Sequence, residues 1–334
     1  MTTDGLWLGP SSAALWAWSN VSVQLQNNPS LLENVLTLCL ITVATCVFLF
    51  INGTMLFTLR SKAVFRDTCR YILLYNLLFA DTVQLLQSQV VFLLAFSKIR
   101  LTYPVCGSLV TLASLTTVIS PLTLVVMSLE RYVAVCYPLR HASIITIRNT
   151  AVAVVAVWVF SLVDSLIRVL LLLEFPFKDL DSLQIKDLCS NVAMLLSSAS
   201  DHYDKSFTCF LFVAAGITII YSFASVINAA RSASTDKTLV HKARNTLLLH
   251  LLQLGLSLSS TIFNPVLVAI SRTVERMVFI RTHKILYLLF ILFPRSLSSL
   301  IYGLRDQTIR PVLVSHLCCR QKAVSSFVTF TRPS

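Results

Sequence analysis

The sequence lacks much of what builds a soluble protein. Only 13% of its 334 residues are charged, against roughly a quarter in ordinary globular proteins, whereas 56% are hydrophobic. Glycine (7) and proline (10) are scarce, which excludes collagen-like and low-complexity chains. The nine cysteines include no CxxC pair, which argues against a zinc or redox motif. With no nucleophile elbow, phosphate-binding glycine loop or His/Glu metal helix either, we expect no enzymatic activity.

What the chain does have indicates a membrane protein. Its mean hydropathy is +0.77 and its formal net charge is +12. Because the basic residues stand in small groups between apolar stretches, they resemble cytoplasmic loops rather than a nucleic-acid-binding run. We therefore expect membrane lipids, and no nucleic acid, among its partners.

Seven apolar runs are long enough to cross a bilayer, which takes about 20 residues. They lie near Leu36 to Leu59, Tyr71 to Phe96, Val105 to Met127, Thr150 to Leu173, Phe207 to Ala230, Thr246 to Ile270 and Lys284 to Leu304. The sequence thus predicts an all-α membrane protein, a seven-transmembrane helix bundle with a short amphipathic cytoplasmic helix. The expected parts are an extracellular segment (1–34), the transmembrane domain (35–304) and a cytoplasmic helix and tail (305–334).

The orientation follows from the basic residues, which are retained on the cytoplasmic face. With the N-terminus outside, 16 of the 27 Lys and Arg residues fall on the cytoplasmic side and 9 on the outer side. We therefore expect a multi-pass protein of the plasma membrane with an extracellular N-terminus and a cytoplasmic C-terminus.

Asp81 is an ionisable residue in the middle of the second span, where an unpaired charge costs several kcal/mol. Polar residues that could face it are Asn52, Ser120, Ser298 and Ser299. Two interpretations stay open. The carboxylate could hold a sodium ion or a water cluster, the only cofactor or metal we consider. Alternatively, a protonated Asp81 could belong to a static hydrogen-bond network.

Two arginines also lie within spans. Arg168 follows Asp164 by four residues, so the two can pair on one helix face. The alternative is that this face borders a ligand cavity, where Arg168 would attract a carboxylate. Arg295 follows Pro294, and a proline permits a kink in the helix. At such a kink the Arg295 side chain could face a hydrated interior of the bundle.

The third span ends in Glu130-Arg131-Tyr132, followed by Tyr137-Pro138-Leu139. An arginine beside a glutamate at the cytoplasmic boundary could act as a latch, paired at rest and offered to a partner when released. A plain boundary charge pair is the other interpretation.

These motifs resemble rhodopsin-like (class A) G protein-coupled receptors, and Pro138 to His141 is similar to the odorant-receptor version. The sixth-helix signature of odorant receptors resembles Lys242-Ala243-Arg244-Asn245-Thr246 followed by His250-Leu251. The ending found in a fish odorant receptor family is similar to Leu297 to Gln307. Further matches are Asn52, Leu77 with Asp81, Trp158, Tyr221 with Ser222, and Tyr302. In departure from the family pattern, Ser298-Ser299 replaces Asn-Pro, the fifth span has no central proline and the sixth has no toggle tryptophan.

The resemblance implies an odorant receptor that binds a small external ligand and activates a heterotrimeric G protein. It assigns coupling and activation to Glu130, Arg131, Tyr132, Tyr221, His250 and Tyr302, and it implies a disulfide between Cys106 and Cys189. Family geometry places a ligand pocket near Ser114, Thr117, Asn191, His202, Lys205 and Thr261, with Arg168 as the candidate named above. His202 and Lys205 would favour an acidic or polar odorant.

Covalent modification is expected at two places. Asn20-Val21-Ser22 is a glycosylation acceptor motif in the extracellular segment. Asp306 to Leu317 has the spacing of an amphipathic helix on the inner leaflet and is followed by Cys318-Cys319, which suit palmitoylation. An unmodified tail and two free thiols remain the alternatives.

Two other functions are compatible with a polytopic membrane protein. A secondary transporter could use Asp81, Asp164 and Arg168 as a coupling relay, but it predicts internal repeats and broken helices, which the sequence does not show. A non-olfactory class A receptor for a peptide or lipid would share every activation motif.

Overall fold

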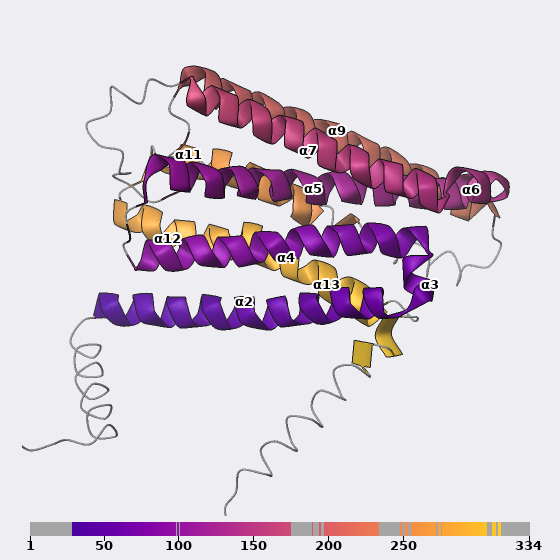
Figure 1. Ribbon diagram of the computed structural model, residues 1–334, viewed down its shortest axis with the longest axis horizontal. Coiled ribbons are helices and arrows are strands. Elements are labelled where there is room, and N and C mark those ends of the chain that lie inside the picture. Colours follow the sequence, from indigo (N-terminus) through magenta and orange to yellow (C-terminus); the bar gives the residue numbers. More distant parts are fainter. Residues whose placement is uncertain are drawn as a thin grey trace, which may run out of the picture. The chain divides into compact units, whose positions relative to one another are not determined.

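The computed structural model describes residues 29–97, 99, 101–174, 189, 194, 197–233, 248, 251–252, 255–271, 273–274, 276–305, 309–311 and 313–314. Five long helices dominate this part of the chain: α2 (Pro29–Ser61), α4 (Cys69–Phe96), α5 (Tyr103–Cys136), α7 (Ile147–Leu173) and α9 (Ser198–Ala233). The shorter elements are α3 (Ala63–Arg66), α6 (Pro138–Ile144), a 3₁₀ turn η2 (Ser260–Ile262), α11 (Phe263–Ser271), α12 (Arg276–Tyr287), a π-helical turn η3 (Leu288–Leu292) and α13 (Phe293–Arg305) (Figure 1).

Five described helices are long and apolar enough to cross a membrane. They are Val35–Ser61, Cys69–Phe96, Tyr103–Cys136, Ile147–Leu173 and Ser198–Ala229, which match the first five predicted spans. The predicted sixth span is described in part, as η2 and α11 with a few residues before them. The predicted seventh span corresponds to η3 and α13 with the end of α12, which follow one another without a break.

Local chemistry explains several helix boundaries. The Thr146 side chain accepts a hydrogen bond from the backbone N–H of Asn149 (3.2 Å) and caps the start of α7. Pro104 lies in the first turn of α5, where its missing N–H is tolerated. The sequence has no helix breaker between Met127 and Pro138, so α5 continues beyond the predicted end of the third span to Cys136.

The chain divides into two compact units, Met1–Cys46 and Val47–Ser334, with the boundary inside α2. Within the second unit, α5 packs against α4, α7 and α9 and also contacts η2. Its largest buried cluster includes Leu74 and Leu77 of α4, Leu124 of α5 and Ile219 of α9. α5 is therefore in direct contact with three other long helices.

The described residues after α13 form part of a short helix that packs on the bundle. Ile309 and Leu313 are buried in the same cluster as Met55, whereas Arg310 and Val314 are exposed. This alternation agrees with the amphipathic pattern of the predicted cytoplasmic helix. A Cβ atom on Gly303 would lie 2.9 Å from the Leu313 side chain, so a larger residue there would require the Leu313 side chain to shift.

Candidate functional site

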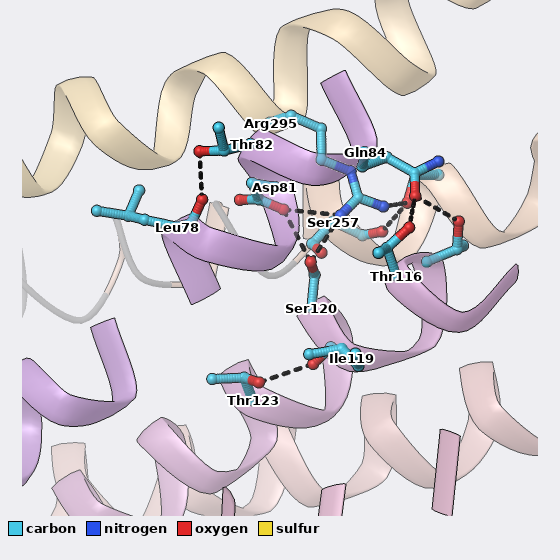
Figure 2. Close-up of polar contacts among 12 residues, drawn as sticks. Leu78, Asp81, Thr82, Gln84, Thr116, Ile119, Ser120, Thr123, Ser257 and Arg295 are labelled. Atoms are coloured by element: carbon cyan, nitrogen blue, oxygen red, sulfur yellow. Dashed lines mark hydrogen bonds and ion pairs between the residues drawn. The ribbon is translucent and has the colours of Figure 1, made fainter. Parts of the chain in front are cut away.

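The first candidate site lies around Asp81, and we call Asp81, Ser120, Ser260 and Arg295 the Asp81 centre. One guanidinium nitrogen of Arg295 lies 2.7 Å from Asp81 Oδ1 and 2.6 Å from Ser120 Oγ (Figure 2). The other terminal nitrogen donates to Ser260 Oγ at 3.3 Å. Ser120 Oγ also donates to Asp81 Oδ1 at 2.8 Å. The centre thus joins α4, α5, η2 and α13.

The backbone around this centre is irregular on two of these helices. The π-helical turn η3 ends directly before Phe293-Pro294, and Pro294 has no N–H to donate to the carbonyl one turn earlier. Pro121 interrupts the hydrogen bonds of α5 next to Ser120. Such breaks are tolerated in membrane helices where neighbouring helices cover them.

Of the residues predicted around Asp81, Ser120 is in direct contact with it, whereas Ser299 donates to the backbone carbonyl of Ser296 at 3.1 Å. Asn52 is fully buried, and its amide has no hydrogen-bond partner within the part of the chain that the structure describes. A buried amide in that situation is normally satisfied by ordered water. Ser298 lies in α13, and its side chain is outside what the structure describes.

The second candidate site is at the end of α5. Arg131 Nε lies 3.2 Å from Glu130 Oε2, so the pair that the latch hypothesis requires is closed in this conformation. The Tyr132 ring contacts the rings of Tyr137 (5.8 Å between centroids) and Tyr221 (6.0 Å). The contact with Tyr221 joins the last turns of α5 to α9.

α5 and α9 are also joined one turn earlier. Ser222, next to Tyr221, donates a hydrogen bond to the backbone carbonyl of Ser128 at 2.8 Å. Both serines are buried. The position of Tyr221 relative to Tyr132 therefore depends on a direct connection between the two helices.

The predicted disulfide is present. Cys106, in the first turns of α5, is bonded to Cys189, which is 83 residues further along the chain. Cys106 is fully buried and packs against Met194. This bond ties the segment between α7 and α9 to the start of α5.

The third candidate site surrounds Arg168. Arg168 Nε lies 3.0 Å from Asp164 Oδ2, and another of its nitrogens contacts Asp204 of α9. The Tyr203 hydroxyl donates to the second oxygen of Asp164 at 3.0 Å, and the guanidinium lies 5.5 Å from the ring centroids of Tyr203 and Phe207. The local pair of the sequence analysis is thus present, and a second carboxylate extends it.

The remaining described candidates for a ligand pocket contact residues of their own helices or of one neighbouring helix. Ser114 and Thr261 donate to backbone carbonyls of their own segments, Thr111 and Leu258. Thr117 donates to Gln84 Oε1 at 3.3 Å. On α9, Lys205 is paired with Asp201 and His202 is exposed.

Comparison with known proteins identifies the family of this chain. The family model for the 7 transmembrane receptor (rhodopsin family) matches residues 51–300. The chain belongs to this family. Its fold is therefore a seven-transmembrane helix bundle, the protein is a multi-pass membrane protein, and the family consists of receptors rather than enzymes.

Individual relatives of this receptor carry chemosensory names. Odorant receptor 131-2 of Danio rerio is 33% identical over 274 residues, which are 82% of this chain and 83% of that protein. Olfactory receptor 2A7 of Mus musculus is 30% identical over 58% of this chain and 61% of its own length. Olfactory receptor-like protein I9 of Rattus norvegicus is 25% identical over 61% and 64%.

Sequence reasoning missed two amides in the receptor's interior. Asn76 accepts a hydrogen bond from Trp158 Nε1 (2.8 Å) and donates to Thr123 Oγ1 (2.9 Å), which connects α4, α5 and α7. Gln84 accepts from both Thr116 and Thr117 of α5. The signal was present in the sequence, because amides inside an apolar span need partners as carboxylates do.

Some predicted residues lie outside the described part of the receptor. These are Asn20, Asn191, His250, Cys318 and Cys319, and the side chain of Tyr302. Their roles in glycosylation, ligand binding, activation and palmitoylation stay predictions.

Proposed function

We propose that this protein is an odorant receptor that binds a small external molecule and activates a heterotrimeric G protein. The observation that carries the proposal is the closed Glu130–Arg131 pair at the end of α5, in a chain of the rhodopsin family. The 33% identity with a fish odorant receptor over 82% of the chain supports the olfactory assignment.

The proposed mechanism is a population shift between two packings of the helices. In the resting packing, Glu130 holds Arg131, and the Tyr132 ring contacts Tyr221. An odorant that binds the open packing more tightly shifts the equilibrium, by no more than its difference in affinity for the two states. Release of Arg131 then offers a planar set of donors to carbonyls of the G protein.

The orientation belongs to the same proposal. The extracellular N-terminus follows from the excess of basic residues on the other face, and it places Arg131 in the cytosol. It also puts the Cys106–Cys189 disulfide on the oxidising side of the membrane. An epitope on the N-terminus should be reached by antibody in intact cells, and one on the C-terminus only after permeabilisation.

We propose a polar rather than an acidic odorant. Of the basic candidates, Arg168 is engaged by Asp164 and Asp204, and Lys205 by Asp201. A carboxylate ligand would have to displace one of these aspartates. A neutral ligand that exchanges hydrogen bonds with side chains such as Thr117 requires no such displacement.

Modification and lipid contacts complete the proposal. We propose glycan attachment at Asn20 and acylation of Cys318 and Cys319 next to the short helix that contains Ile309 and Leu313. Arg310 is exposed on that helix and suits a lipid phosphate. The basis is the sequence pattern together with the burial of the helix's apolar face.

The decisive experiment measures second-messenger responses to a panel of neutral, acidic and basic odorants in cells that co-express an olfactory-type G protein. We expect the wild-type receptor to respond and Arg131→Ala to be silent at equal surface level. Arg140→Ala is the matched control, because Arg140 is an exposed basic residue on the neighbouring helix α6 and should leave the response intact. A full response of Arg131→Ala would overturn the proposal.

A further inference from the structure

Arg295 is the largest fully buried side chain of the described residues, although arginine is almost never buried without a partner. It is 1% exposed, and Asp81 is 2% exposed. The Arg295 guanidinium contacts the Asp81 carboxylate, although the two residues are 214 positions apart in the sequence. The bundle therefore encloses a buried ion pair next to Pro121 and Pro294, at which two helices are interrupted.

The oxygens around this pair are those that a small cation would use. A hard cation binds carboxylate and hydroxyl oxygens, and Asp81 and Ser120 carry one of each. In the structure Asp81 Oδ1 and Ser120 Oγ both lie within 2.7 Å of the same nitrogen of Arg295. A sodium ion bound to these two oxygens would lie next to the positively charged guanidinium of Arg295, which is already in contact with both.

The residues present therefore do not fit a sodium ion while Arg295 holds its place. The carboxylate is neutralised by the guanidinium, and a second cation in this buried volume would be repelled because the low dielectric screens the two charges poorly. Asp81 and Arg295 together are neutral, which also removes the attraction that would draw an ion from outside.

We propose that Arg295 is a tethered cation that takes the place of a diffusible sodium ion at Asp81, so that the stability and resting state of this receptor do not depend on sodium. The proposal rests on the receptor fold and on the contacts of Arg295. It does not depend on which ligand the receptor binds or on which G protein it activates.

The tether has a consequence for movement of the helices. An ion can leave the bundle when its oxygens separate, whereas the guanidinium stays attached to α13. Its contact with Ser260 of η2 is the longest of the three, at 3.3 Å, and Ser260 belongs to the segment of the predicted sixth span. Displacement of that segment would break this contact first and leave the contacts with Asp81 and Ser120 in place.

The test uses the purified receptor and sodium alone. Thermal unfolding is compared in about 150 mM sodium chloride and in the same concentration of N-methyl-D-glucamine chloride, which has equal ionic strength. We expect the wild-type midpoint to be the same in both salts. Arg295→Ser removes the guanidinium and leaves Asp81 with hydroxyl neighbours, so its midpoint should rise by several degrees in sodium.

Two further variants separate a cation site from a general salt effect. Arg295→Lys keeps a positive charge and should stay insensitive to sodium. Asp81→Asn combined with Arg295→Ser has no carboxylate, so sodium should not stabilise it. Sodium sensitivity of this double variant would assign the effect to another site and overturn the proposal.

The wild-type measurement is decisive even where Arg295→Ser is too unstable to purify. A sodium-dependent rise in the wild-type midpoint would show that an ion binds despite Arg295. Insensitivity of a folded Arg295→Ser variant would show that the Asp81 centre is not a cation site. Neither result depends on odorant responses, so failure of this proposal and failure of the odorant assignment are distinguishable.

Discussion

Arg168 and Arg295 both lie within membrane spans, and their charges are neutralised in different ways. Arg168 pairs with Asp164 one turn earlier on the same helix and lies near the aromatic rings of α9, with 16% of its side chain exposed. Arg295 has no acidic neighbour on its own helix and pairs with Asp81 on another, with 1% of its side chain exposed. One charge is neutralised as soon as a helix forms, and the other only when the bundle is complete.

This difference indicates separate roles for the two pairs. A local pair lets a polar segment enter the membrane as a single helix, because the charges arrive already neutralised. A pair between distant helices favours the packing in which both partners meet, because any other packing leaves a buried charge uncompensated. The Arg168 pair therefore serves the folding of α7, and the Arg295 pair helps to select the arrangement of α4, α5 and α13.

Breaking the long-range pair should have the largest effect. Asp81→Asn leaves the Arg295 guanidinium buried without its carboxylate, so we expect the receptor to lose about 3–5 kcal/mol of stability. Unfolding of the purified receptor in detergent micelles measures this loss. Combining the change with Arg295→Met removes both charges and should restore much of it; a double variant as unstable as the single one would contradict the role of the pair.

Breaking the local cluster should have a smaller effect. Arg168→Met leaves Asp164 and Asp204 close together, but its site is partly exposed and Tyr203 still donates to Asp164, so we expect a loss of about 2–3 kcal/mol. Asp204→Asn should be milder still, because Arg168 keeps Asp164. A larger loss for Arg168→Met than for Asp81→Asn would reverse the comparison.

A neutral contact between distant helices tests whether distance or charge matters. Trp158→Phe removes the donor to Asn76 but keeps an aromatic ring, and we expect a loss of about 0.5–1.5 kcal/mol, as for a single neutral hydrogen bond. The same unfolding measurement applies, and Asn76→Ala combined with Trp158→Phe shows whether the two act through one bond. If Trp158→Phe cost as much stability as Asp81→Asn, the loss would depend on the sequence separation of the partners and not on their charge.

An exposed pair on one helix gives the lower limit. Lys205 and Asp201 are four residues apart on α9, and 49% of the Lys205 side chain is exposed. Lys205→Ala should therefore change the free energy of unfolding by less than about 0.5 kcal/mol. If odorant responses fall at the same time while stability is unchanged, Lys205 contacts the ligand rather than supporting the fold.

The parts of the structure that depend on short stretches of sequence were predictable. Apolar length predicted the first five spans, and the spacing of Asp164 and Arg168 predicted their pair. The disulfide was implied by the family resemblance. The Glu130–Arg131 contact was predictable because the two residues are adjacent in the sequence.

Contacts between distant helices could not be read from the sequence. Asp81 and Arg295 were each recognised as unusual, but nothing in the chain states that two residues 214 positions apart meet. The partners of Asn76 depend likewise on the relative rotation of α4 and α7. Rotation of a helix about its axis is decided by packing, and an almost uniformly apolar helix gives little periodic signal to predict it.

Gly303 links the position of the short helix that contains Ile309 and Leu313 to the position of α13. Gly303 lets the Leu313 side chain lie against α13 and the Met55 side chain at the same point. Any tilt of this end of α13 must shift the Leu313 side chain, and with it the short helix to which Leu313 belongs. The position of that short helix is thereby coupled to α13, the helix that also carries Arg295.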